Sequence, residues 1–147
     1  TEIRKVMVDE TDIVFLSTEA SVEENLQRVS ETPHTRYPLV GADLEAVEGI
    51  VYVPSIVDRT DELKAGAVTF SELAAPPMTM SADTTVSDAI DQFQAESQEI
   101  ALILSDGDVV GLLTATDALE AVMGDLEDPL DEERSSDQPG FGKPSPE

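Results

Sequence analysis

Two copies of one pattern occupy most of this chain, and this internal repeat constrains the fold more than any other feature. Residues 20–41 align without gaps on residues 84–105, with apolar residues falling on apolar residues. In each copy, apolar residues recur at i, i+4 and i+7, which predicts a helix with one buried face. Short apolar runs follow and predict strands. After a shortening by two residues the alignment resumes with Gly49 on Gly111, so each copy predicts strand, helix, strand, strand and helix over about 60 residues.

Capping residues mark where the predicted helices begin. Ser21 and Glu24 have the spacing of a capping box, in which each side chain binds the backbone N–H of the other residue. Thr85 precedes the second amphipathic helix as an N-cap residue. Pro54 suits the first turn of a helix. Pro33 ends the first amphipathic helix, because the residue before a proline disfavours the helical conformation.

The connecting segments carry weaker signals. Residues 12–16 are apolar enough to predict a strand before the first helix, whereas residues 58–69 are polar and predict a loop or a frayed helix. Residues 70–73 are short and apolar, and a pair of prolines follows them. Asp106 and Gly107 predict a tight turn between two strands.

A unit of about 60 residues buries too little apolar surface to be stable alone. We therefore expect the two repeats to pack against each other with pseudo-twofold symmetry, in an α+β fold. The expected boundaries are 1–66 for the first repeat with its leading segment, 67–124 for the second repeat, and 125–147 for an acidic, disordered tail. Ligand sites are expected in the clefts between the repeats, where two related sets of loops converge.

Residues 108–119 are typical of a buried strand that runs into a helix. Gly111 interrupts the apolar run, which indicates that another backbone or a ligand approaches closely. Thr114 and Thr116 are cap-type residues, and the free N–H groups of a helix N-terminus attract anions. Asp117 suits the two hydroxyl donors of a diol, and a diol beside a phosphate describes a nucleotide. The alternative is that these residues only cap the helix.

The charge of the chain restricts its partners. The net charge is −24, and residues 1–124 alone hold 24 acidic and 6 basic side chains. Phosphate backbones need Lys and Arg, so no nucleic acid is expected as a partner. Acidic, lysine-poor surfaces are typical of proteins that work in concentrated salt, where self-repulsion is screened. We therefore expect a cytoplasmic protein of a halophile.

The residue types argue against an enzyme. The chain has no cysteine and one histidine, His34, which excludes cysteine-based zinc sites and disfavours most catalytic triads. It shows no nucleophile–base pair, no cluster of metal ligands and no Gly-rich phosphate loop followed by Lys. No apolar run approaches the ~20 residues of a membrane-spanning helix. The chain does not begin with Met, which is expected of a piece of a longer protein.

The two copies, with the Gly-x-x-Thr-x-x-Asp motif at Gly111, Thr114 and Asp117, resemble a CBS-domain pair, also called a Bateman module. More narrowly, the chain resembles the CorC/CNNM proteins, which are hemolysin-like membrane proteins of magnesium and cobalt transport. The resemblance covers residues 3–128. Its motifs, in chain order, are Val6-Met7-Val8, Thr11-Asp12-Ile13, His34-Thr35-Arg36-Tyr37-Pro38, Ile100-Ala101-Leu102-Ile103-Leu104, the segment 111–117 and the segment 121–128.

The resemblance implies a regulatory module that binds an adenine nucleotide (ATP or AMP, with or without Mg²⁺) between the repeats and forms a homodimer. In this family a transmembrane transporter domain precedes the module in the parent chain, so the module lies on the cytosolic face of the membrane. By the same resemblance, Asp117 holds the ribose hydroxyls, and Thr114 and Thr116 face the ribose and phosphates. The base lies among apolar and aromatic side chains, and Thr35 and Arg36 line the mouth. The implied nucleotide-binding residues are Asp117, Thr114, Thr116, Leu112, Ile13, Thr35, Arg36 and Tyr37, with no catalytic residue and no metal ligand.

Two departures from the family pattern change the expected site. Ser55 stands in the first repeat where Asp117 stands in the second, so the pseudosymmetric second site lacks its diol acceptor and is expected to be empty. Asp9 and Glu10 replace a proline and a base in the leading segment, and their charges would repel phosphates lying nearby. Bridging Mg²⁺, high salt or a less charged nucleotide would reduce this repulsion.

The assignments have alternatives. The alternative function is a ligand-free structural dimerisation module whose cleft is simply packed. Single residues have alternatives of their own: Arg36 pairs with a surface carboxylate, Tyr37 packs in the core, and His34 is a surface residue rather than a phosphate ligand. The acids of residues 125–128 bind Mg²⁺ directly in one interpretation and are solvated in the other.

If the acidic surface is an adaptation to salt, the folded state should weaken when salt is removed. We expect the melting temperature to fall steeply as KCl is lowered from about 1 M to about 0.1 M, because the Debye length grows from about 3 to about 10 Å and acidic side chains then repel one another. Thermal unfolding followed by far-UV circular dichroism measures this. A melting temperature that is the same at both salt concentrations would contradict the prediction.

Overall fold

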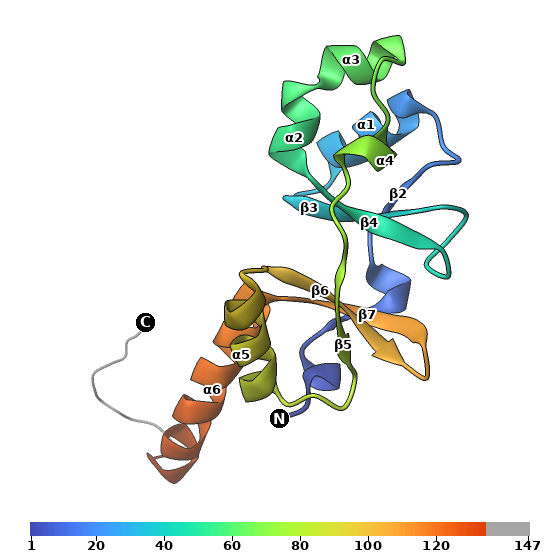
Figure 1. Ribbon diagram of the computed structural model, residues 1–147. Helices are drawn as coiled ribbons and strands as arrows, with labels where there is room; N and C mark the ends of the chain where they lie inside the picture. The colour runs from blue at the N-terminus through green and yellow to red at the C-terminus, as the bar shows by residue number, and fades with distance from the viewer. Residues whose placement is uncertain (135–147) are drawn as a thin grey trace.

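Two β-sheets, each covered on its outer face by helices, form the molecule (Figure 1). The computed structural model describes the backbone of residues 1–134 and the side chains of residues 1–124. One sheet has the strand order β2-β3-β4 and the other the order β1-β7-β6-β5. The strands are β1 (Val8–Asp9), β2 (Leu16–Ser17), β3 (Arg36–Val40), β4 (Val47–Tyr52), β5 (Met78–Ser81), β6 (Ile100–Ser105) and β7 (Asp108–Thr114). The helices are the 3-10 helices η1 (Ile3–Lys5) and η2 (Glu10–Asp12) and the α-helices α1 (Val22–Glu31), α2 (Val53–Asp58), α3 (Thr60–Ala65), α4 (Phe70–Leu73), α5 (Val86–Glu96) and α6 (Ala115–Arg134).

The predicted α+β class and tandem-repeat organisation are confirmed, since each sheet has its own apolar core beneath its own helices. In the first core, Leu39 of β3 and Ile56 of α2 are almost fully buried. In the second core, Val86 and Phe93 of α5 pack with Leu113 of β7, as the i, i+7 spacing predicts. The helices therefore cover the outer faces of the sheets and leave the inner faces to meet each other.

The local signals at helix and turn positions are confirmed. Ser21 and Glu24 form the predicted capping box, and the hydrogen bond from the backbone N–H of Ser21 lowers the pKa of Glu24 below its ordinary value. Thr85 caps α5 through a bond from the N–H of Asp88, and a proline lies in the first turn of α2. Residues 106 and 107 have φ of 53° and 85°, which makes the tight turn between β6 and β7.

The strand predicted at residues 12–16 forms only at its last residue. Asp9 accepts hydrogen bonds from the N–H and the hydroxyl of Thr11, and this cap starts the 3-10 helix η2, which includes Asp12, while Ile13 is extended but lies outside any strand. The pKa of Asp9 is lowered chiefly by the bond from the Thr11 N–H. Only residues 16 and 17 are left to form the strand β2.

Helical structure extends further than the sequence predicts at two places. The polar segment 58–69 contains the ordered helix α3, whose Leu63 is fully buried in the first core. The last helix, α6, continues to Arg134 and so passes residue 124, where the tail was expected to begin. The remainder of that tail, residues 135–147, lies outside the described residues.

The leading segment of each repeat crosses to the sheet of the other repeat. Strand β1 pairs with β7, with Val8 opposite Leu112, so residues 8 and 9 complete the second sheet. Ile3 is fully buried in the second core. In the symmetric position, Ala75 pairs with Ile50 of the first sheet through two backbone hydrogen bonds of 2.8 and 2.9 Å. The two repeats are therefore joined by backbone pairing as well as by side-chain packing.

Two related glycines permit this crossing. A Cβ at Gly49 would lie 2.6 Å from the carbonyl oxygen of Ala75, and a Cβ at Gly111 would overlap the side chain of Met7. The prediction that another segment approaches Gly111 closely is therefore confirmed. At Gly49 the obstacle is backbone, whereas at Gly111 it is a flexible thioether side chain.

The inner faces of the sheets meet through a third apolar cluster. Ile50 of the first sheet packs with Ile100, Leu102 and Leu112 of the second, and Ile13 closes the cluster from the segment between η2 and β2. All five side chains are buried. This cluster, called here the inter-sheet cluster, separates two edges of the interface, and both edges carry polar residues.

The two glycines should tolerate alanine differently. We expect Gly49→Ala to lower the free energy of unfolding by about 3 kcal/mol and Gly111→Ala by about 1 kcal/mol, because overpacking against backbone relaxes less than overpacking against a methionine side chain. Denaturant unfolding of both variants measures the difference. Equal losses in the two variants would contradict the explanation.

Candidate functional site

Strand β3 sends neighbouring side chains to opposite faces of the first sheet. Arg36 lies opposite Tyr52 of β4, and Tyr37 lies opposite Val51. Since Val51 is buried in the first core, Tyr37 points into that core. Arg36 therefore points the other way, toward the second repeat.

Arg36 makes the contact that joins the two repeats at this edge. Its Nη1 lies 3.5 Å from Oε1 of Glu99, the residue that precedes β6. Its Cζ lies 4.5 Å from the centroid of the Tyr52 ring, within range of a cation–π interaction. The guanidinium thus lies between an aromatic ring of its own repeat and a carboxylate of the other. We call the edge formed by Arg36, Tyr52, Glu99 and the start of α6 the arginine edge.

The start of α6 belongs to the same edge. The N–H of Ala115 donates to the carbonyl oxygen of Glu99 at 2.9 Å, which fixes the helix start beside the Arg36 partner. Thr114 Oγ1 accepts from the N–H of Asp117 at 3.1 Å, so Thr114 is the N-cap residue that the sequence indicates. Asp117 is half-buried and Thr116 is exposed. The N–H groups of Ala115 and Asp117 are thus already bonded within the chain, and the carboxylate of Asp117, the hydroxyl of Thr116 and the N–H of Thr116 lie within the same helical turn.

The structure places the apolar members of the predicted site next to this edge. Leu112 is two residues before Thr114 on β7 and so shares its face of the sheet. Ile13 joins Leu112 in the inter-sheet cluster, where the two side chains are 8% and 9% exposed. Thr35 is exposed, and its carbonyl oxygen accepts from the N–H of Val53 at 2.8 Å. Seven of the eight residues expected at the site thus lie around the arginine edge or in the adjoining cluster.

Tyr37 is the eighth, and the structure places it elsewhere. Its side chain has no exposed surface. Its hydroxyl bonds to the hydroxyl of Thr32 and donates to the Thr32 carbonyl oxygen at 3.2 Å. His34 packs edge-on against its ring, with centroids 5.6 Å apart, and is exposed. A base cannot lie against Tyr37 in this arrangement. Neighbouring residues of a strand point to opposite faces, so Tyr37 is buried in the core while Arg36 faces the second repeat.

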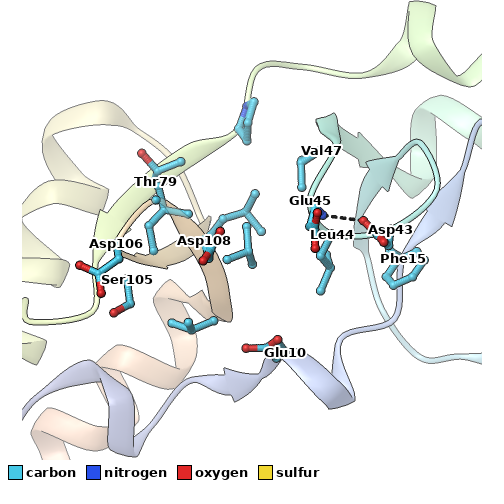
Figure 2. Close-up of a pocket in the computed structure, with 16 residues that line it drawn as sticks. Glu10, Phe15, Asp43, Leu44, Glu45, Val47, Thr79, Ser105, Asp106 and Asp108 are labelled. Atoms are coloured by element: carbon cyan, nitrogen blue, oxygen red, sulfur yellow. Dashed lines mark hydrogen bonds between the residues drawn. The ribbon is translucent and has the colours of Figure 1, made fainter.

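The opposite edge of the interface holds a pocket of about 880 Å³ between the β3–β4 hairpin and the β6–β7 hairpin (Figure 2). It is called here the hairpin pocket. Apolar side chains such as Phe15 and Leu44 line part of it, and carboxylates surround it from three segments of the chain. The acids among its lining residues are Glu10, Asp43, Glu45, Asp106 and Asp108, and no Lys or Arg is among them. None of the residues expected to bind a nucleotide lines this pocket.

Glu10 of the leading segment lines this hairpin pocket. Strand β1 runs antiparallel to β7, with Asp9 opposite Gly111, so the chain proceeds from there away from Thr114. Glu10 then reaches the pocket beside the hairpins. Glu10 therefore lies away from the start of α6, whereas Asp9 pairs at the middle of β7, and the repulsion of phosphates by these two acids stays a prediction.

Two residues of the arginine edge, Tyr52 and Glu99, are not among those that the sequence predicts for the site. The repeat alignment contained the signal for both, because Glu99 falls on Thr35 and Tyr52 falls on Thr114. The structure preserves these relations, since the bond from Val53 to Thr35 in the first repeat matches that from Ala115 to Glu99 in the second.

This edge offers binding groups rather than catalytic ones. Arg36 and the N-terminus of α6 suit an anion and Asp117 suits hydroxyl donors, while Ile13 and Leu112 of the cluster beside them are 8% and 9% exposed. No group of acids and histidine among the described residues is arranged to hold a metal ion. Within residues 1–134, none of the helices combines the length and the apolar character needed to cross a lipid bilayer.

Sequence comparisons identify relatives of the chain. Residues 65–124 match the family model of the CBS domain. The magnesium and cobalt efflux protein CorC of Salmonella typhimurium is 25% identical over 138 residues, which are 92% of this chain and 46% of CorC. The chain spans less than half the length of the curated relatives that it matches.

Solved structures share the fold. The CBS domain of a bacterial CNNM/CorC family Mg²⁺ transporter in complex with ATP superposes with a TM-score of 0.76 at 21% identity, over 84% of this chain and 88% of that one. A CBS-domain pair with bound AMP from Klebsiella pneumoniae superposes with a TM-score of 0.73 at 21% identity, over 84% of this chain and 99% of that one. The paired-sheet architecture described above is therefore that of CBS-domain pairs.

Replacing the buried tyrosine should separate packing from binding. We expect Tyr37→Phe to lower the free energy of unfolding by about 1 kcal/mol, because it removes the hydroxyl that bonds to Thr32. The ligand affinity of the arginine edge should stay unchanged. Denaturant unfolding measures the first effect and calorimetric titration the second. A stability equal to that of the unaltered chain would show that the hydroxyl contributes nothing in the core.

Proposed function

Because this chain carries a CBS domain and is homologous to the CorC/CNNM magnesium and cobalt efflux proteins, we propose that it is a regulatory module that binds an adenine nucleotide. The observation that carries the proposal is the arginine edge, where Arg36 of one repeat lies beside the start of α6 in the other. One ligand that contacts both groups senses the relative position of the repeats. Binding there therefore couples to the geometry of the whole module.

The proposed binding mode follows from the side chains. The ribose hydroxyls donate to Asp117, and Thr114 and Thr116 lie alongside the ribose and phosphates. Arg36 and the N-terminus of α6, through the N–H of Thr116 and the helix dipole, bind the phosphates, and Thr35 lies at the mouth. The base packs at the rim of the inter-sheet cluster, against the small parts of Ile13 and Leu112 that remain exposed. Tyr37 is left out of the site because it is buried.

Relatives support the choice of ligand. One similar structure is a complex with ATP and another contains AMP, which shows that CBS-domain pairs of this architecture accept adenine nucleotides. The Ser55 position supports a single site, since the first repeat has no carboxylate where Asp117 stands in the second. Mg²⁺ enters the proposal only with the nucleotide, as a counter-ion of its phosphates.

The partners in this proposal are a second copy of the chain and a transporter domain. Val57 of α2 and Leu119 and Met123 of α6 are apolar and 51–67% exposed, which supports a homodimer formed through helices. The CBS domain of a CNNM/CorC family Mg²⁺ transporter has the same fold, which supports a parent protein in which this module sits on the cytosolic side of a membrane domain and reports nucleotide binding to it. The module itself would carry out no catalysis.

A ligand-free dimerisation module is the competing function. The contacts of Arg36 with Glu99 and Tyr52 favour it, because they show that the guanidinium has partners without a ligand. The two functions differ in one measurement. A bound ligand at 100 times its dissociation constant stabilises a protein by about 2.7 kcal/mol, whereas a packed, ligand-free edge gains nothing from added nucleotide.

Asp117→Ala tests the proposed binding mode. We expect this variant to bind ATP and AMP 10- to 100-fold more weakly, roughly, because a hydrogen bond to a charged group contributes about 1.5–3 kcal/mol. Isothermal titration calorimetry measures the affinities. Asp108→Ala is the matched control, since it removes the same charge from the opposite end of β7 and should change them less than about twofold.

Unchanged affinity in Asp117→Ala would refute the assigned role of this carboxylate. Lack of binding to the unaltered chain, with ATP or AMP and with or without Mg²⁺, would refute the nucleotide function and leave the dimerisation module.

A further inference from the structure

We propose that Glu99 is a specificity-determining residue, which competes with the nucleotide phosphates for Arg36 and so penalises highly charged phosphate chains. This role rests on the proposed function, since it concerns the same site. It assigns to Glu99 a function opposite to that of the binding residues. Glu99 lowers affinity, and it does so in proportion to ligand charge.

The geometry makes the competition unavoidable. Glu99 lies 3.5 Å from the Arg36 guanidinium, and Tyr52 holds the same guanidinium from its ring face. A phosphate that binds Arg36 must share or displace this carboxylate. The backbone of Glu99 cannot move away, because its carbonyl oxygen accepts from the Ala115 N–H that starts α6.

The exchange of partners is energetically accessible. The side chain of Glu99 is 68% exposed and that of Arg36 is 29% exposed, so a ligand can approach both and Glu99 can turn into solvent. A half-exposed ion pair of this kind is weak, whereas phosphate and guanidinium form charge-assisted, frequently bidentate hydrogen bonds. The phosphate therefore displaces Glu99 from the guanidinium of Arg36, but the carboxylate of Glu99 stays near the bound phosphate.

The penalty depends on the charge of the ligand. Adenosine has no phosphate and needs no contact with Arg36, so Glu99 does not affect its binding. AMP places one phosphate near the carboxylate, and ATP without Mg²⁺ places more negative charge there, with Coulomb repulsion adding for each charge. Glu99 therefore selects against uncomplexed ATP relative to AMP, and Mg²⁺, which lowers the negative charge of ATP, weakens the selection.

A purely structural interpretation of the same contact makes a different prediction. If Glu99 only ties the two repeats together, its removal lowers stability and does not strengthen the binding of any ligand. Stability and affinity therefore have to be measured on the same variants.

Glu99→Gln is the test, because it keeps the shape of the side chain and removes its charge. Calorimetric titrations with ATP, AMP and adenosine, all without Mg²⁺, should show tighter ATP binding by about two- to fivefold, a smaller gain for AMP and none for adenosine. The matched control is Glu96→Gln at the exposed end of α5, which removes the same charge three residues away. Glu96→Gln should change the affinity for ATP by less than half of the change that Glu99→Gln causes.

A further comparison isolates the competition for Arg36. In an Arg36→Gln background, Glu99→Gln should raise the affinity for ATP clearly less than it does in the unaltered chain, because there is no guanidinium for Glu99 to release. An undiminished gain in that background would overturn the competition. Equal gains in Glu99→Gln and Glu96→Gln, an equal gain for adenosine, or no gain with ATP would overturn it as well.

These outcomes are separable from failure of the proposed function. If neither the unaltered chain nor Glu99→Gln binds any of the three ligands, the nucleotide function is refuted, and the proposed role of Glu99 is refuted with it. If ATP binds both with the same affinity, the nucleotide function stands and only the role of Glu99 is overturned. Thermal unfolding of each variant shows whether it is folded before titration.

Discussion

The exchange of leading segments between the repeats is the constraint on which the rest of the structure depends. Residues 8 and 9 complete the second sheet, and Ala75 pairs with the first. Because each sheet is finished by the other repeat, neither has a complete edge alone. The crossing is fitted to Gly49 and Gly111, since a Cβ would meet the backbone of the crossing segment at Gly49 and the flexible Met7 side chain at Gly111. The orientation of the two inner faces, and with it the arginine edge, follows from this exchange.

Alternation along one strand then divides core from site. In β3, Tyr37 enters the first core and hydrogen-bonds to Thr32, while its neighbour Arg36 faces the second repeat. Adjacent residues of one strand thus stabilise the first repeat, through Tyr37, and present a cation to the second, through Arg36. A strand that is buried on one side and faces a partner repeat on the other can supply packing and binding from adjacent positions.

Charge distinguishes the two edges of the interface. The hairpin pocket is surrounded by carboxylates, whereas the arginine edge combines a guanidinium, a helix N-terminus and two carboxylates with different proposed tasks. In a chain of net charge −24, an anionic ligand meets repulsion over most of the surface. At the arginine edge, Arg36 and the N-terminus of α6 attract an anion instead, and Glu99 weakens this attraction.

The sequence by itself determined the local features of this protein: the repeat, the capping box at Ser21, the tight turn at residues 106–107 and the capped start of α6. These depend on residues a few positions apart, which interact whatever the rest of the chain does. It also indicated most of the residues that gather around the arginine edge. Only the tertiary structure decided that β1 completes the second sheet, that Tyr37 is buried and that Glu99 reaches Arg36. Such contacts join segments far apart in the chain, and they form only once the burial of two sheets against each other has set the register and facing of each strand.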